Sequence, residues 1–205
     1  MRLANIFISH SRKDKEIITF FDSIFSGSKV KAVKVEFEKI KAEAIPSITI
    51  RKKIKQAKAA FVLLGPNVEL TIYTRNWISF EIGLAAALGK PIWVFEPIQS
   101  NIKFPIPYLN HYMQYELEYD REYITSIVKA YEKSKVEPPD GFIVKCSYDN
   151  CKLPFMLHTK TYSFNCPACR QPLQINSLDS PTKKYYYQDP ITGLDERMVK
   201  ESSKQ

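Results

Sequence analysis

The sequence has few cysteines, histidines and glycines, and their placement is uneven. None of the four cysteines lies in the first 145 residues, whereas the disulfide frameworks of small secreted domains run through the whole chain. No apolar run is long enough to span a bilayer, and no amino-terminal segment combines a basic start, an apolar centre and a small-residue cleavage site. We therefore expect a soluble, cytoplasmic protein without a membrane partner, and a metal site in place of disulfides.

Basic residues exceed acidic ones, with a formal net charge of +8. The excess is spread along the chain, because residues 1–137 carry +6 and residues 138–205 carry +2. The densest basic run, "RKKIKQAK" from Arg51 to Lys58, also holds apolar residues at helical spacing. Its charges therefore fit the solvent-facing side of an amphipathic helix, and we do not expect nucleic acid as a partner.

Predicted strands and helices alternate along the first two thirds of the chain. Apolar runs or alternation predict strands near residues 4–9, 30–37, 59–64 and 91–97. Helical spacing of apolar residues predicts helices near 12–25, 47–58, 75–88 and 119–135. This order indicates the α/β class, a flavodoxin-like parallel sheet with helices on both faces. Ligands of such sheets bind at the carboxyl ends of the strands, where loops 10–13 and 38–47 should gather.

A cluster of turn-forming residues divides the chain into parts. The sequence Pro138-Pro139-Asp140-Gly141 is typical of a linker. We predict a first domain over residues 1–137, a small β-rich module over 138–178 and a partly disordered tail over 179–205.

Glu81 is the one carboxylate in the apolar stretch "RNWISFEIGLAAALGKPIWVF". On a helix it shares a face with Trp77, Leu84, Ala85 and Leu88. A carboxylate buried there needs compensation, because burial without partners is costly and raises its pKa. A structural ion pair and a functional carboxylate both remain open on this pattern alone.

Three stretches together resemble a known family. These are "IFISHSRKD", "AAFVLLGPN" and "NWISFEIGLAAALGKPIWVF". In order and spacing they are similar to the Toll/interleukin-1 receptor (TIR) domain, particularly its prokaryotic members, over about residues 3–135. The most specific elements are the FISHS opening and the tryptophan four residues before Glu81.

The resemblance implies an activity and its residues. Enzymatic TIR domains cleave NAD between nicotinamide and ribose, giving ADP-ribose or cyclic ADP-ribose isomers, and Glu81 matches their catalytic glutamate. Ser9, His10, Arg12 and Trp77 would then bind the substrate. The family also implies antiviral defence signalling and a homo-oligomer. Many members carry Pro-Gly in the loop that gates the site, where this chain has Pro46-Ser47.

Two other functions compete with NAD cleavage. The stretch "FEIGLAAALGKPI" is also similar to the glutamate helix of nucleoside 2-deoxyribosyltransferases, which would again place Glu81 at an N-glycosidic carbon. Many TIR domains, moreover, are adaptors that assemble through their surfaces without catalysis.

The cysteines form two close pairs. Cys146 and Cys151 are separated from Cys166 and Cys169 by a spacer of fourteen residues. Two such pairs suit a tetrahedral metal, and the module resembles a zinc ribbon. Four thiolates fill the coordination shell, so the expected Zn²⁺ is structural. We expect His158, in the spacer, to be a surface strand residue, and the ribbon to dock a protein partner.

Overall fold

The computed structural model describes residues 4–35, 47–70, 72–98, 100, 102–133, 139, 141–158, 163–174, 185–188 and 195–198. Its centre is a seven-stranded sheet with the order β2-β1-β3-β4-β5-β7-β6, in which six strands run parallel and β6 runs antiparallel to β7. The first five strands are β1 (Ala4–His10), β2 (Val30–Lys34), β3 (Ala59–Leu63), β4 (Ile92–Pro97) and β5 (His111–Tyr115). Their order is that of a flavodoxin-like sheet.

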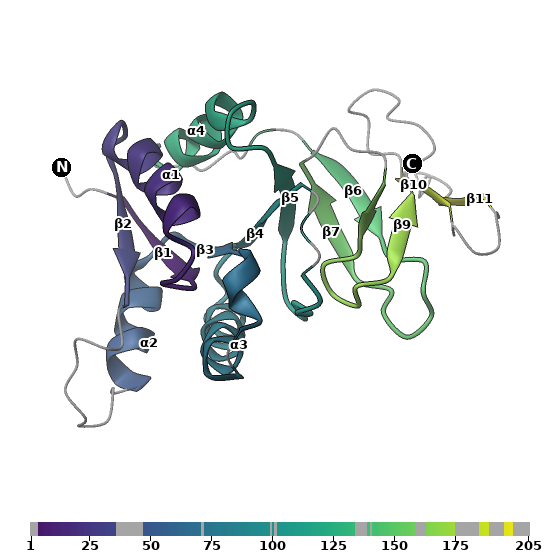
Figure 1. Cartoon of the computed structure of the whole chain (residues 1–205), viewed down its shortest axis with the longest axis horizontal. Helices are drawn as coiled ribbons and strands as arrows, with labels where there is room; N and C mark the ends of the chain where they lie inside the picture. Colours follow the sequence, from purple (N-terminus) through teal and green to yellow (C-terminus); the bar gives the residue numbers. More distant parts are fainter. Residues whose placement is uncertain are drawn as a thin grey trace, which may run out of the picture.

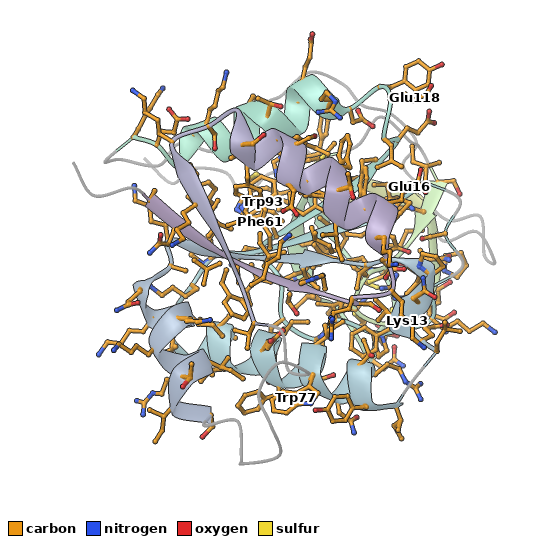
Figure 2. All side chains as sticks on the ribbon, turned by 60° about the vertical axis from the view of Figure 1, so that its left-hand side comes forward. Lys13, Glu16, Phe61, Trp77, Trp93 and Glu118 are labelled. Carbon is orange, nitrogen blue, oxygen red and sulfur yellow. The ribbon has the colours of Figure 1, made fainter. Side chains whose placement is uncertain are left out.

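Helices cover both faces of this sheet (Figure 1). They are α1 (Lys15–Ser26), α2 (Ser47–Gln56), α3 (Ile72–Ala87) and α4 (Arg121–Ala130). Figure 2 shows α1 and α4 on one side of the sheet and α2 and α3 on the other. The expected α/β class, with a mostly parallel sheet between helices, is confirmed.

Helix α1 buries the apolar stripe that its sequence predicts. In α1 the buried residues include Ile17, Phe21 and Ile24, which recur three to four positions apart. Gly27 ends this helix as expected. Gly89, two residues beyond α3, has a φ of 63°, the left-handed conformation that favours glycine after a helix.

Two apolar cores lie on the two faces of the sheet. The core under α1 and α4 contains Phe21, Phe61 and Trp93, and Figure 2 shows Phe61 and Trp93 between the sheet and α1. The core under α2 and α3 includes Ile54 and Ile78. All five residues of β3 are buried, as expected for a central strand covered on both faces.

The sheet continues into the carboxyl-terminal part of the chain. Strands β6 (Phe142–Lys145) and β7 (Pro154–Leu157) form a hairpin, and β7 pairs in parallel with β5. A second sheet has the order β11-β10-β9-β8, from β8 (Ser163–Asn165), β9 (Pro172–Gln174), β10 (Tyr185–Gln188) and β11 (Asp195–Met198). The domain boundary predicted near residue 137 stays a prediction. Strand β5, before it, and strand β7, after it, pair with each other in the same sheet.

One residue prediction is wrong: His158 is buried, with 4% of its surface exposed. Its Nε2 lies 3.0 Å from Nδ1 of His111, and its Nδ1 lies 3.0 Å from the hydroxyl of Tyr123. The cause is the pairing of β7 with β5, since the backbone N–H of His158 donates to the carbonyl of Tyr112. The imidazole therefore lies between the main sheet and α4 and is buried.

Candidate functional site

Glu81 lies in the middle of α3 with only 6% of its surface exposed. Ser9, near the end of β1, donates a hydrogen bond from Oγ to Oε2 of Glu81 at 2.6 Å. Burial raises the pKa of Glu81 to about 8, and the hydrogen bond from Ser9 acts in the opposite direction. The free site is therefore predominantly protonated at neutral pH, and a nearby positive charge would favour its ionised form.

A cavity of about 320 Å³ opens beside Glu81. Its lining comes from the end of β1 and the loop after it, from Val35 after β2 and from residues 73–81 of α3. Because these strands are parallel, the cavity lies at the carboxyl ends of β1 and β2, where ligands of such sheets bind. The lining residues are Ile8, His10, Ser11, Arg12, Lys13, Val35, Tyr73, Thr74, Trp77, Ile78 and Glu81.

Two walls of the cavity differ in chemistry. One wall is basic and polar, with His10 from the end of β1 and Arg12 and Lys13 from the loop that follows it. The other is aromatic, where Tyr73 packs edge-on against Trp77 with their ring centroids 5.9 Å apart. Figure 2 shows Lys13 near the start of α1 and Trp77 on α3. Such a cavity suits a ligand with an anionic group and a flat ring.

A buried aspartate anchors the basic loop. The carboxylate of Asp14 accepts hydrogen bonds from the backbone N–H and the side-chain amide of Asn67, at 3.0 and 2.6 Å. A Cβ at Gly65 would lie 2.3 Å from Cγ of Asp14, so only glycine admits this approach. Burial raises the pKa of Asp14, opposed by the bonds from Asn67. The loop after β1 is thus tied to the turn after β3, which fixes the basic wall beside α3.

A larger cavity, of about 530 Å³, lies between α4 and the β6–β7 hairpin. The carboxylates in its lining are Asp120 and Glu122, and neither is buried. We place the candidate catalytic site at the smaller cavity, because a buried carboxylate with a raised pKa is the stronger sign of chemistry.

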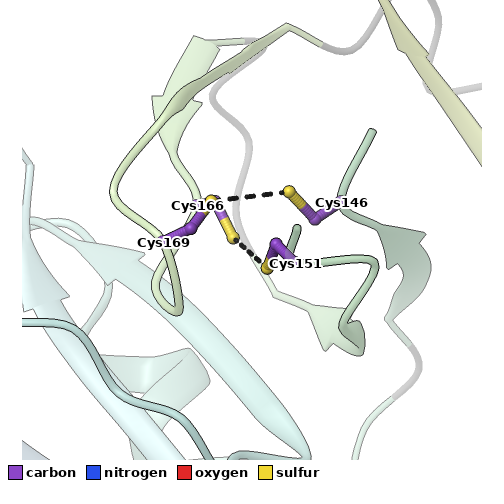
Figure 3. Close-up of side chains that lie close together, drawn as sticks. All are labelled: Cys146, Cys151, Cys166 and Cys169. Atoms are coloured by element: carbon purple, nitrogen blue, oxygen red, sulfur yellow. Dashed lines mark hydrogen bonds between the residues drawn. The ribbon is translucent and has the colours of Figure 1, made fainter. Parts of the chain in front are cut away.

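The second candidate site is the group of four cysteines (Figure 3). Their sulfur atoms all lie within 4.8 Å of one another. Sγ of Cys146 is 3.6 Å from Sγ of Cys169, and Sγ of Cys151 is 3.9 Å from Sγ of Cys166. A tetrahedral zinc with four thiolates would separate its sulfurs by about 3.8 Å, given Zn–S bonds of about 2.3 Å. The group can therefore bind a metal ion, and its dimensions fit zinc.

Each cysteine pair is held by a tight backbone turn. Cys151 N–H donates to the carbonyl of Tyr148, and Cys166 N–H donates to that of Gln171. Lys152 and Arg170, which directly follow the second cysteine of each pair, have φ values of 47° and 63°. The hydrogen bond with Cys146 lowers the pKa of Cys166 to about 6.

Every residue predicted for the two sites lies at one of them. Ser9 contacts Glu81, while His10, Arg12 and Trp77 line the cavity beside it. Sequence reasoning missed Lys13 and Tyr73 as lining residues. Lys13 belongs to loop 10–13, which the sequence placed at the ligand end of the sheet. Tyr73 lies one helical turn before Trp77 on the same face of α3, and that spacing was the available signal. The loop predicted to gate the site, 38–47, lies almost wholly outside the described residues.

Among the helices that the structure describes, each is too short or too polar to cross a membrane. No protein-family model matches the sequence, and no curated protein matches it significantly.

Proposed function

We propose that the chain is an NAD-cleaving enzyme of the TIR type, which releases nicotinamide and gives ADP-ribose or a cyclic isomer. The observation that carries the proposal is the buried Glu81 at a cavity with one basic and one aromatic wall. The resemblance of the motifs around Ser9 and Glu81 supplies the substrate class. The cavity supports it, because NAD offers both anionic phosphates and flat rings.

The protonation of Glu81 suits a cationic substrate. The carboxyl has a pKa of about 8 in the free protein, and the pyridinium of NAD would lower that pKa by placing a positive charge nearby. Substrate binding would therefore ionise Glu81 where its charge is needed. Because Ser9 already holds the ionised carboxylate in place, little reorganisation would be needed as positive charge develops on the ribose.

The reaction needs little beyond this carboxylate. The bond between the ribose carbon and nicotinamide breaks, its electron pair leaves on the ring nitrogen, and positive charge grows on the ribose. Glu81 stabilises that oxocarbenium-like state. Water then adds to the same carbon, and the carboxylate accepts its proton. If a nitrogen of the adenine adds in place of water, the product is cyclic.

The test compares the native chain with Glu81→Gln, incubated with NAD at high protein concentration. Chromatography would follow nicotinamide, ADP-ribose and cyclic products. Loss of nicotinamide release in Glu81→Gln supports the proposal when Glu122→Gln, an exposed carboxylate on α4, keeps the native rate. Equal release by Glu81→Gln and the native protein would contradict it. Base exchange with deoxynucleosides and no NAD cleavage would favour the deoxyribosyltransferase.

An adaptor function has its own supporting observation. Ile72, Tyr73 and Phe80 on α3 are exposed to 69, 57 and 40%. Exposed apolar side chains on one helix are suited to a protein contact. Assembly in solution without turnover of NAD or nucleosides, and insensitive to Glu81→Gln, would support this alternative.

We propose zinc as the ion of the four cysteines, in a ribbon with a structural role. Two sulfur-to-sulfur distances near the value for tetrahedral zinc support it. The family resemblance further suggests a homo-oligomer that signals in antiviral defence. We also propose that the protein is cytoplasmic and that the ribbon docks a protein partner. Light scattering with and without NAD would test the oligomer, and a change in mass on adding NAD is the expected result.

A further inference from the structure

The turn that carries Cys166 and Cys169 is docked on the main sheet. This turn, residues 166–170, is closed by a hydrogen bond of 2.8 Å from the backbone N–H of Arg170 to the carbonyl of Cys166. Its Pro167 carbonyl accepts a hydrogen bond of 2.9 Å from the N–H of Ile106. Ile106 belongs to the loop that joins β4 to β5, residues 98–110. The metal site is therefore in direct contact with that loop.

The side chain of Arg170 makes the second contact. Its Nη1 donates to Oε2 of Glu96 at 2.8 Å, and its Nε donates to the carbonyl of Phe104 at 2.7 Å. The two charged side chains are 9 and 3% exposed, so the ion pair is buried. Glu96 lies near the end of β4, and it also accepts hydrogen bonds from the hydroxyls of Tyr112 and Ser100. Removal of one partner from such a pair leaves an uncompensated buried charge, which is strongly destabilising.

The loop in turn contacts the beginning of α3. The backbone N–H of Lys103 donates to the carboxylate of Glu69, three residues before α3 begins. Phe104 and Ile106 belong to the same apolar core as Ile78 of α3. The route from the cysteines to the Glu81 helix thus consists of a buried ion pair, backbone hydrogen bonds and a shared core.

We propose that Arg170 is a positioning residue, through which the metal-loaded turn orders residues 102–110 and the first turns of α3, and so regulates the Glu81 site. Metal binding at a four-cysteine site is coupled to folding of the residues that carry it. Without the metal, the short turn loses the bonds that hold Arg170 toward Glu96. Glu96 then has to be hydrated, and residues 102–110 must open to admit water. The contacts described above support the ordering of these residues by Arg170, and only its effect on activity rests on the proposed NAD cleavage.

The test is amide hydrogen exchange of the full chain, zinc-loaded and after chelation. Chelation should speed exchange at the amides of Lys103 and Ile106, and at residues 76–78 in the first turns of α3, by about tenfold or more, the scale expected when a charged buried hydrogen bond is lost. Zinc-loaded Arg170→Met should show the same increase. The amides of β1 and β3 should keep their rates, which shows that the fold persists. Chelation of Arg170→Met should add little at these residues, because the connection is already broken.

Lys152→Met is the matched control. Lys152 follows the second cysteine of the other pair, and its ammonium bonds within its own turn, to the Ser147 carbonyl and to Asp149. This variant should leave exchange at Lys103, Ile106 and residues 76–78 unchanged. Arg170→Lys keeps the charge but loses the planar pair of donors, so it should fall between native and Arg170→Met. Native exchange in zinc-loaded Arg170→Met, or equal increases in it and Lys152→Met, would overturn the proposal.

Activity separates this inference from the proposed function. If NAD is cleaved, zinc-loaded Arg170→Met should lose at least about tenfold in kcat/KM while retaining its bound zinc. Turnover that is indifferent to Arg170 and zinc would refute the regulation and leave the NAD reaction standing. Exchange that depends on Arg170 in a protein without turnover would uphold the ordering and reject the proposed reaction.

Discussion

The hydroxyl of Ser9 and the carboxylate of Glu81 are joined by a hydrogen bond of 2.6 Å, which links the end of β1 to the middle of α3. Burial favours the protonated carboxyl, and the hydrogen bond favours the ionised one. The two residues therefore set the protonation of the site together, which leads to two predictions about pH.

Replacing Ser9 with alanine should move the pH profile of the reaction. The proposed mechanism requires ionised Glu81, so kcat/KM of the native protein should rise with pH through about 8, the pKa of the free site. Ser9→Ala removes a bond that lowers this pKa, and the rising limb should shift upward by about one pH unit. Initial rates of nicotinamide release between pH 5 and 10 would measure it. Ser11→Ala, in the same cavity, should leave the limb in place; a native limb below pH 6 would contradict the assignment.

Replacing Glu81 with glutamine should change how stability depends on pH. The folded pKa of about 8 lies above the ordinary value of 4.5, so the native state holds a proton that the unfolded chain releases between these values. The contribution of protonated Glu81 to the free energy of unfolding is fully present below about pH 4.5. It is lost progressively as the pH rises to 8, by an amount on the order of 5 kcal/mol. Glu81→Gln should not show this loss. Urea unfolding at pH 5, 7 and 9 would measure it; parallel curves for the two proteins would disprove a buried neutral carboxyl.

Two glycine substitutions should have opposite outcomes. In Gly65→Ala the new Cβ would lie 2.3 Å from Cγ of Asp14 and displace the carboxylate from Asn67, with a cost of about 1–3 kcal/mol. In Gly83→Ala the Cβ meets no atom within 4 Å inside α3, so this change should stabilise the protein by about 0.5–1 kcal/mol. Chemical unfolding of both variants would test this. Equal losses would show that the approach of Asp14 to Gly65 is not the cause.

Metal analysis should find one zinc per chain. Cys166→Ser removes a ligand from a fully buried position and should abolish stoichiometric zinc, while chelation of the native protein should lower its melting temperature. His158→Gln is the control, because His158 is near the cysteines in sequence but contacts His111 and Tyr123. It should retain its zinc. Native protein purified and reconstituted without bound zinc would reject the zinc site.

The sequence predicted those elements whose apolar spacing is regular. The strands at β1, β3 and β4 and the helices α1 and α3 were found because their buried residues recur with a period of two or between three and four, or fill the whole segment. Strand β5, "HYMQY", was missed, because its histidine and glutamine interrupt any apolar run. Its pairing with β7 joins segments about 45 residues apart, and local patterns do not contain such pairings.

The candidate sites were predicted unevenly for a similar reason. The burial of Glu81 follows from its helical neighbours, and the grouping of the cysteines follows from their spacing. The pairing of Arg170 with Glu96 could not be anticipated, because an arginine after the last cysteine resembles a surface residue until its turn is docked. The burial of His158 was missed for the same reason: it depends on which strand lies beside β7.

The parallel pairing of β5 with β7 also protects an edge. In a chain shortened to residue 137, the carbonyl groups of Asn110 and Tyr112, which accept hydrogen bonds from the N–H groups of Met156 and His158, would have no strand to pair with. An unpaired edge strand with buried aromatic residues on both sides is a template for pairing with another chain. Self-association or insolubility of such a shortened protein would therefore result from the loss of β7 beside β5. It should not be taken for the functional assembly of the intact chain.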